Sequence, residues 1–209
     1  MESKTPPPES EPESRPDKLS QNVPFTAQAP FGNWHDRRYQ NACEEASVLM
    51  AAKWLNGENL TAEEASAEIA EMVAYQQENY GFYIDSSAKD TARFFREYYG
   101  YQNIRLKDVA SVEDIKLELA AGNLVIVPAD GQKLGNPNYT PPGPARHMLI
   151  VIGYDDERGV FITNDPGTRR GQGFVYAYDI LFAAIRDYES GDHTPIINGE
   201  KSMIVVEAL

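Results

Sequence analysis

The chain has 209 residues, 42% of them hydrophobic, which is enough for one well-buried core and too little for two. Its 32 acidic and 19 basic residues leave a formal charge of -13, which argues against a nucleic-acid partner because phosphate binding needs clustered Lys and Arg. An acidic, solubilising surface explains this charge, and a cationic peptide substrate would also fit it. No run approaches the ~18 consecutive apolar residues of a membrane span.

The amino-terminal segment differs in composition from the rest of the chain. It is rich in Pro, Glu and Ser and has almost no apolar side chains, so it cannot offset the entropy of ordering. We therefore predict a disordered linker over 1–21 and a single domain over 22–209. The segment lacks the basic and then apolar pattern of a signal peptide, and the compartment stays open. The domain would be extracytoplasmic if an upstream export or anchor segment had been removed.

Four helices are predicted in the first half of the domain. The first has apolar residues at helical spacing from Ala46 to Trp54, with Asn41 as its N-cap and Glu44 completing a capping box. It is expected to end near Asn56. The other three begin at N-caps that are followed three positions later by an acidic residue: Thr61, Ser87 and Ser111.

Strands are predicted to dominate the second half. Short apolar runs rich in β-branched and aromatic residues occupy 124–129, 147–154, 159–165, 174–178 and 202–208, and a late helix is expected over 178–188. Helices first and an antiparallel meander later indicate an α+β domain with no internal repeat.

Cys43 is the single cysteine of the chain, so it cannot form an internal disulfide. It falls in the first turn of the first predicted helix, where unpaired N–H groups and the helix dipole favour an anion and lower the pKa of a thiol. Glu44 and Glu45 oppose this effect mildly, although on a helix they need not face the thiol. The alternative is a buried cysteine that only packs.

Three histidines could act as a base for such a thiol. His147 begins the strongest predicted strand and follows a long loop rich in Gly and Pro, which would place its ring at a sheet end on the rim of a cleft. His35 could line the same cleft from a loop, and His193 lies in what reads as a surface loop. The alternative for His147 is a strand-end residue satisfied by local hydrogen bonds.

Asp165 ends the strand that follows the one begun by His147. Two strands joined by a short turn are antiparallel neighbours, so the start of the first should lie beside the end of the second. His147 should then meet Asn164 or Asp165, and only one of the two can face it because side chains alternate along a strand. The alternative for Asp165 is an Asx-turn residue before a Pro-Gly pair.

Gln28 stands 15 residues before Cys43 in an extended, aromatic segment. A side-chain amide there could donate to a developing oxyanion together with a backbone N–H at the helix start. A glutamine by itself indicates nothing, and this interpretation depends on the residues that accompany it.

Four segments together, VPFTAQAPFGNW, YQNACEEASVLMA, HMLIVIGYD and FITNDPGT, resemble the C39-like branch of papain-like cysteine peptidases. The resemblance runs from about Val23 to the end of the chain. It implies a papain-like α+β fold, with a helical half that carries the nucleophile at a helix start and packs on a C-terminal antiparallel sheet. It also implies the site roles: nucleophile Cys43, base His147, orienter Asp165 and oxyanion-hole residue Gln28.

The resulting hypothesis is a monomeric cysteine peptidase or amide hydrolase that acts on a peptide or amide through an acyl-enzyme, without metal or cofactor. The same residues could transfer the acyl group to an amine instead of water. A papain-like module that binds a peptide or cell-wall fragment without cutting it is the alternative from another class. A third hypothesis is that Cys43 is a redox sensor, although the chain contains no second cysteine that could resolve an oxidised thiol.

Overall fold

The computed structural model describes residues 15–193, 196 and 199–208. Most of the predicted linker, residues 1–14, lies outside the described residues. The helices are α1 Arg37–Gln40, α2 Cys43–Leu55, α3 Ala62–Tyr80, α4 Ala88–Tyr99, α5 Val112–Ala120, α6 Gly131–Leu134 and α7 Tyr178–Ala184. The strands are β1 Lys18–Ser20, β2 Ile104–Asp108, β3 Leu124–Ala129, β4 His147–Asp155, β5 Val160–Asn164, β6 Phe174–Ala177 and β7 Ser202–Val206.

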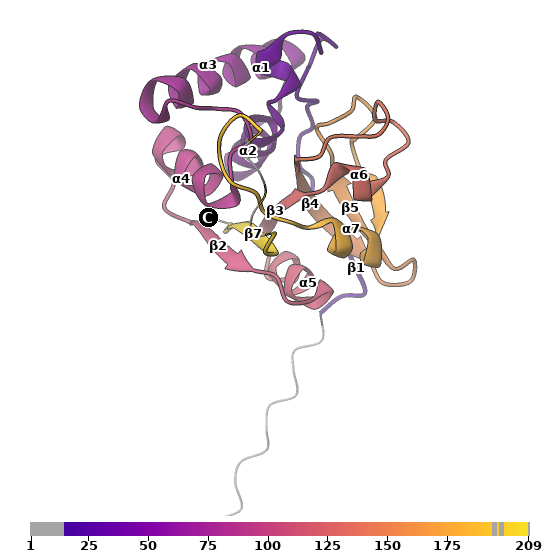
Figure 1. Cartoon of the computed structure of the whole chain (residues 1–209). Coiled ribbons are helices and arrows are strands. Elements are labelled where there is room, and N and C mark those ends of the chain that lie inside the picture. The colour runs from indigo at the N-terminus through magenta and orange to yellow at the C-terminus, as the bar shows by residue number, and fades with distance from the viewer. Residues whose placement is uncertain (1–14, 194–195, 197–198, 209) are drawn as a thin grey trace, which may run out of the picture.

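The strands form one antiparallel sheet with helices on both faces. Alternate side chains of β3 point in opposite directions, with Leu124 and Ile126 in one apolar cluster and Val125 and Val127 in the other. The first cluster is shared with α2, α3 and α4, and the second with α5 and α7. Figure 1 shows this arrangement, with the N-terminal helices on one side of the strands. The fold is therefore mixed α and β around an antiparallel sheet, as predicted.

The strand order is β2-β7-β3-β4-β5-β6. The stretch from β3 to β6 is the predicted meander, whereas the closing strand β7 returns to insert between β3 and β2. The sequence pattern did not predict β2, a charged edge strand, and the late helix is shorter than predicted. That helix stops at Ala184 because Ile185 leaves it to bridge Ala129 of β3.

Side-chain caps start three of the long helices, as predicted. Thr61 and Ser111 form capping boxes, and the Ser87 side chain accepts from the Asp90 N–H. The predicted cap of α2 by Asn41 is wrong. Its N-cap is Ala42, which has no side-chain cap, because Asn41 ends α1 and donates to the Arg37 carbonyl instead.

The boundary predicted between linker and domain at 21/22 is also corrected. Lys18–Ser20 form β1, which pairs with the last residues of β4, and Arg15 forms ion pairs with Glu113 and Asp156. The strand passes so close to Gly153 that a Cβ there would lie 2.2 Å from the Leu19 carbonyl oxygen. Backbone hydrogen bonds, ion pairs and the packing of Leu19 hold this segment, and its composition, with few apolar side chains, did not predict that order. Within the described part of the chain, no helix is long and apolar enough to cross a membrane.

Candidate active site

Cys43 is the first residue of α2, and its side chain is almost buried, at 8% exposed. The start of α2 packs against the start of β4, where the Ser47 hydroxyl donates to the Met148 carbonyl at 3.4 Å. Because His147 is the first residue of β4, this packing brings the helix start and the strand start to the same place. Helix α2 and strand β4 thus carry the thiol and the imidazole into one site.

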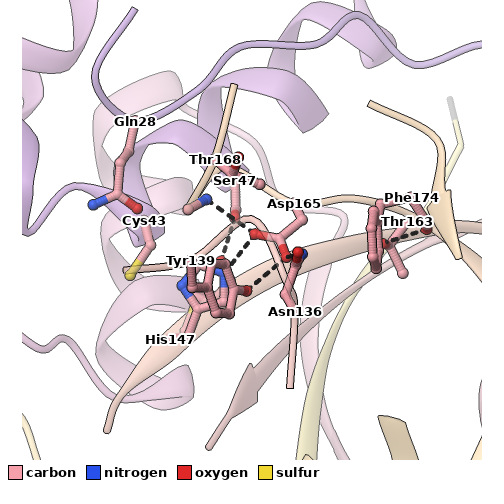
Figure 2. Close-up of polar contacts among 12 residues, drawn as sticks. Gln28, Cys43, Ser47, Asn136, Tyr139, His147, Thr163, Asp165, Thr168 and Phe174 are labelled. Carbon is pink, nitrogen blue, oxygen red and sulfur yellow. Dashed lines mark hydrogen bonds and ion pairs between the residues drawn. The ribbon is translucent and has the colours of Figure 1, made fainter. Parts of the chain in front are cut away.

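A cavity of about 340 Å³ opens at this point. Cys43, His147 and Gln28 all line it, and Figure 2 shows their side chains together on one side of the site. Its other walls come from the long loop before β4 and from four further places along the chain: Trp34, Gln40, Asn41, Asp85, Tyr139, Thr140, Gly143, Pro144, Ala145, Arg146, Gly167 and His193. Three of the four residues singled out in the sequence therefore line one cavity.

The fourth, Asp165, lies fully buried behind the imidazole. His147 Nε2 and Asp165 Oδ1 are 2.8 Å apart, across the β4–β5 hairpin as its pairing predicts. Asn164, the rival orienter, points the other way, and its side-chain amide donates to the Val23 carbonyl. With Nε2 engaged by the carboxylate, Nδ1 is the imidazole nitrogen left for chemistry.

Five donors surround the Asp165 carboxylate, drawn in part in Figure 2. Besides His147, they are the hydroxyls of Tyr139 and Tyr176, each at 2.6 Å, the Asn136 amide at 3.1 Å and the Gly167 N–H at 2.9 Å. Burial alone would raise the pKa of Asp165, but His147 and the hydroxyls of Tyr139 and Tyr176 lower it to about 2. The aspartate is thus held charged and immobile against the ring.

Asn136, Tyr139 and Tyr176 were not among the site residues predicted from the sequence. The first two belong to the loop before β4, which had been assigned only a general cleft role, and Tyr176 is the one buried residue of β6. A glycine at position 167 lets the loop pack against both rings, because a Cβ there would lie 2.9 Å from the His147 ring and 2.9 Å from the Tyr139 ring. Its only sequence signal was the Pro-Gly turn.

Gln28 lies in the cavity wall, but its amide is already engaged. The Nε2 group donates to the Gln40 carbonyl at 2.7 Å and to the Tyr39 carbonyl at 3.1 Å. Both acceptors belong to α1, so both amide hydrogens of Gln28 are already engaged. The Cys43 N–H, at a helix start for which the described contacts show no side-chain cap, is a donor that remains at the cavity.

Comparison with known proteins identifies the family. Residues 20–192 match the model of the Peptidase_C39 like family. The chain belongs to this family. Among solved structures, it is similar to a protein described as a C39-like peptidase from Bacillus anthracis, with 15% identity and a TM-score of 0.56 over 91% of this chain and 98% of that one. It is also similar to xylellain, a cysteine protease from Xylella fastidiosa, with 13% identity and a TM-score of 0.53 over 94% and 87% of the two chains.

At these identities the two structures show the fold alone, which is that of C39-like, papain-like cysteine proteases. No curated protein matches the sequence. Within the described residues of this C39-like chain, no group of three or more His, Cys, Asp or Glu side chains could hold a metal ion.

Glu44 in this C39-like chain lies where the sequence did not lead us to expect it, next to the thiol. It is buried and faces the thiol: Cys43 Sγ donates to Glu44 Oε2 at 3.0 Å, and the Tyr188 hydroxyl donates to Oε1 at 2.8 Å. Burial raises the pKa of Glu44 to about 7. Burial, and next the charge of Glu44, raise the pKa of the Cys43 thiol well above its usual value. The expected lowering by the helix start is therefore outweighed.

Glu45 is a second buried carboxyl close to Cys43 in the sequence. Its Oε1 accepts from the Gln76 amide, and its Oε2 has no hydrogen-bond partner in the described part of the chain. Burial, followed by the charge of Glu44, raises the pKa of Glu45 well above its usual value. The charge of Glu44 thus opposes the ionisation of Glu45.

The other two histidines are both exposed, and of the two only His193 lines the cavity. His193 lies at the cavity rim, where its backbone N–H and its Nδ1 both contact Asp85 Oδ2 at 2.9 Å. Asp85 also pairs with Arg146, and both Asp85 and His193 have positive φ angles, of 54° and 51°. His35 is exposed and is absent from the cavity wall, which its neighbour Trp34 lines instead.

Proposed function

We propose that this chain is a cysteine peptidase or amide hydrolase in which Cys43 is the nucleophile, His147 the general base and Asp165 its orienter. The observation that carries the proposal is the 2.8 Å contact between His147 Nε2 and Asp165 Oδ1, at the wall of the cavity that Cys43 also lines. A histidine held by a buried carboxylate beside a thiol is the arrangement that nucleophilic catalysis requires.

The proposed reaction begins with proton transfer from Cys43 Sγ to His147 Nδ1. The thiolate attacks the carbonyl carbon of a bound amide, and the imidazolium returns its proton to the leaving nitrogen as the C–N bond breaks. Water then attacks the thioester with His147 again as base, which releases the acid and restores the thiol. Asp165 holds the Nε2 proton in place and stabilises the imidazolium that forms.

Two side chains must move for this sequence. The Cys43 thiol donates to Glu44 Oε2 and has to turn toward His147 before attack, a change between staggered rotamers. For the oxyanion, the Cys43 N–H supplies one donor. Gln28 would supply a second only after its longer hydrogen bond, the 3.1 Å contact with the Tyr39 carbonyl, is released.

A papain-like module that binds peptides without cutting them is the second candidate. The observation that favours it is the thiol itself, which donates to a carboxylate and has a raised pKa. Because only a thiolate is nucleophilic at useful rates, the protonation of Cys43 separates the two candidates.

The rate of Cys43 alkylation by iodoacetamide from pH 4 to 9, in the native chain and in His147→Ala, tests the proposal. Burial and Glu44 raise the pKa of the thiol in the rotamer that faces Glu44. Once the thiol turns toward His147, we expect alkylation well below pH ~8.5, the value for a free cysteine, and a loss of that reactivity in the variant. A profile at or above the ordinary thiol value that is the same in both proteins would reject the catalytic base and favour the binding module. Because Cys43 is the single thiol, no other cysteine contributes to the signal.

Glu44→Gln is expected to make Cys43 more reactive. The amide keeps the shape of the carboxyl and removes the negative charge 3.0 Å from Sγ, so the alkylation profile should shift by about one unit or more toward lower pH.

The stability of the Glu44→Gln variant should also depend on pH differently from that of the native chain. Since the pKa of Glu44 is raised from 4.5 to about 7, its contribution is fully present below pH 4.5 and is lost as pH rises through about 7. The native chain should therefore lose stability between pH 4 and pH 8, and the variant should lose less. The difference in unfolding free energy, variant minus native, should be more positive at pH 8 than at pH 4.

Glu63→Gln is the matched control, because Glu63 is exposed in the first turn of α3 and makes the same charge change away from the site. It should leave both the alkylation profile and the pH dependence of unfolding unaltered. Superimposable curves for Glu44→Gln and Glu63→Gln would show that Glu44 does not control the thiol.

A further inference from the structure

A second cavity, of about 450 Å³, opens beside the one that holds Cys43. The two share Trp34, Thr140 and Gly167 as walls, so they form one continuous groove. Beyond the shared walls, the second cavity is lined by Pro137, Asn138, Thr168, Arg169 and Arg170. We call this second cavity the basic pocket, because its lining includes two arginines and no acidic side chain.

The two arginines of the basic pocket carry charges that no carboxylate of the described residues offsets. Both are exposed, and the described residues give no ion pair for either. Elsewhere most guanidinium groups are neutralised by a carboxylate, as for Arg15, Arg37, Arg38, Arg93, Arg105 and Arg186. A chain with a formal charge of -13 therefore keeps two uncompensated positive charges at its groove.

The loop that carries these arginines is fixed to the His147–Asp165 pair. The Asp165 N–H donates to the Gly171 carbonyl at 3.0 Å, which closes the loop, and the Gln28 N–H holds it at Pro166. A Cβ at Gly171 would lie 1.8 Å from the Asp165 carbonyl oxygen, so the loop ends pack tightly together. Arg169 and Arg170 are thus held in the same short loop as the residue that orients the imidazole.

We propose that the basic pocket binds an acidic side chain of the peptide substrate, at a position close to the amide that Cys43 attacks. This rests on the proposed function for the identity of the substrate as a peptide. A guanidinium fork matches a carboxylate with two parallel hydrogen bonds, and Trp34 offers an apolar wall for the rest of the substrate. The local charge of the groove is therefore opposite to the charge of the whole chain, which had suggested a cationic peptide. At physiological salt, exposed charges beyond about 8 Å are screened, so the arginines dominate inside the pocket.

Equilibrium binding to the Cys43→Ala chain tests the pocket without relying on turnover. The probes are fluorescent peptides of one length that carry Glu, Gln or Lys at each position in turn. We expect Glu to bind about tenfold more tightly than Gln at one or two adjacent positions, because a charge-assisted pair contributes more than a neutral one. The preference should disappear in the Arg169→Glu/Arg170→Glu variant and decrease with added salt.

Arg158→Glu is the control, since Arg158 is also exposed and lies in the β4–β5 turn, outside both cavities. It should keep the preference for Glu. Equal binding of Glu and Gln peptides, or the same preference in the double variant as in the Arg158→Glu control, would overturn the pocket assignment.

The same peptides offered to the native thiol separate the two proposals. Cleavage that favours Glu at the position found by binding would support both. Cleavage without such a preference would reject the basic pocket and leave the peptidase assignment standing. A Glu preference in binding without cleavage of any peptide would reject the peptidase assignment and support the pocket.

Discussion

Cys43→Ala should lower the rate of amide hydrolysis at least about 10³-fold, to the background of the assay. The acyl-enzyme needs a covalent bond to Sγ, and the chain has no second cysteine that could take its place. Cys43→Ser should be inactive too, because a hydroxyl is far less acidic than a thiol and His147 would have to remove its proton beside the Glu44 carboxyl. Release of the amine from a fluorogenic peptide measures the effect.

The fold should survive this substitution. Cys43 is a small side chain whose thiol contributes one hydrogen bond, and Glu44 keeps its second donor, the Tyr188 hydroxyl. A thermal unfolding midpoint within a few degrees of the native value would show that lost turnover reflects chemistry. Turnover retained in a folded Cys43→Ala protein would remove the proposed mechanism.

The contacts that the sequence could anticipate are those set by local pattern. The β4–β5 turn fixes which strand ends meet, so the pattern could bring His147 to the Asn164–Asp165 pair and predict that only one of the two faces it, whereas the choice of Asp165 came from the family resemblance. Likewise, hydroxyl caps followed by an acidic residue located the starts of α3, α4 and α5 within a residue. Each of these depends on neighbours a few positions away.

The remaining features depend on distant partners. Glu44 turns inward because Tyr188, 144 positions later, donates to it, and no local signal in α2 indicates that. Tyr139 and Tyr176 reach Asp165 from different segments in the same way. A helical residue can face the core or solvent with the same neighbours, so the sequence could not predict that the thiol would lie beside a buried carboxyl.

Asp165→Asn should reduce turnover by about 10²- to 10⁴-fold while Cys43 stays in place. The carboxylate only accepts hydrogen bonds, and all five of its contacts are donors. An asparagine amide must turn its NH₂ group toward at least one of them, either His147 or the tyrosines. If it faces His147, the ring takes the tautomer with the proton on Nδ1 and can no longer accept the thiol proton. Both the maximum value of kcat/KM and the pH dependence of kcat/KM should change, because the substitution alters the protonation of His147.

The same variant should lose stability in a way that depends on pH. Because the pKa of Asp165 falls from 3.8 to about 2 on folding, its charge contributes roughly 2 kcal/mol above pH 3.8, which is lost as pH decreases through about 2. Urea unfolding at pH 7 and pH 2.5 should show a deficit for Asp165→Asn that is larger at pH 7. Asp108→Asn, at an exposed position that ends β2, should show none at either pH. A deficit equal at both pH values would mean that Asp165 acts through packing alone and that its charge does not stabilise the site.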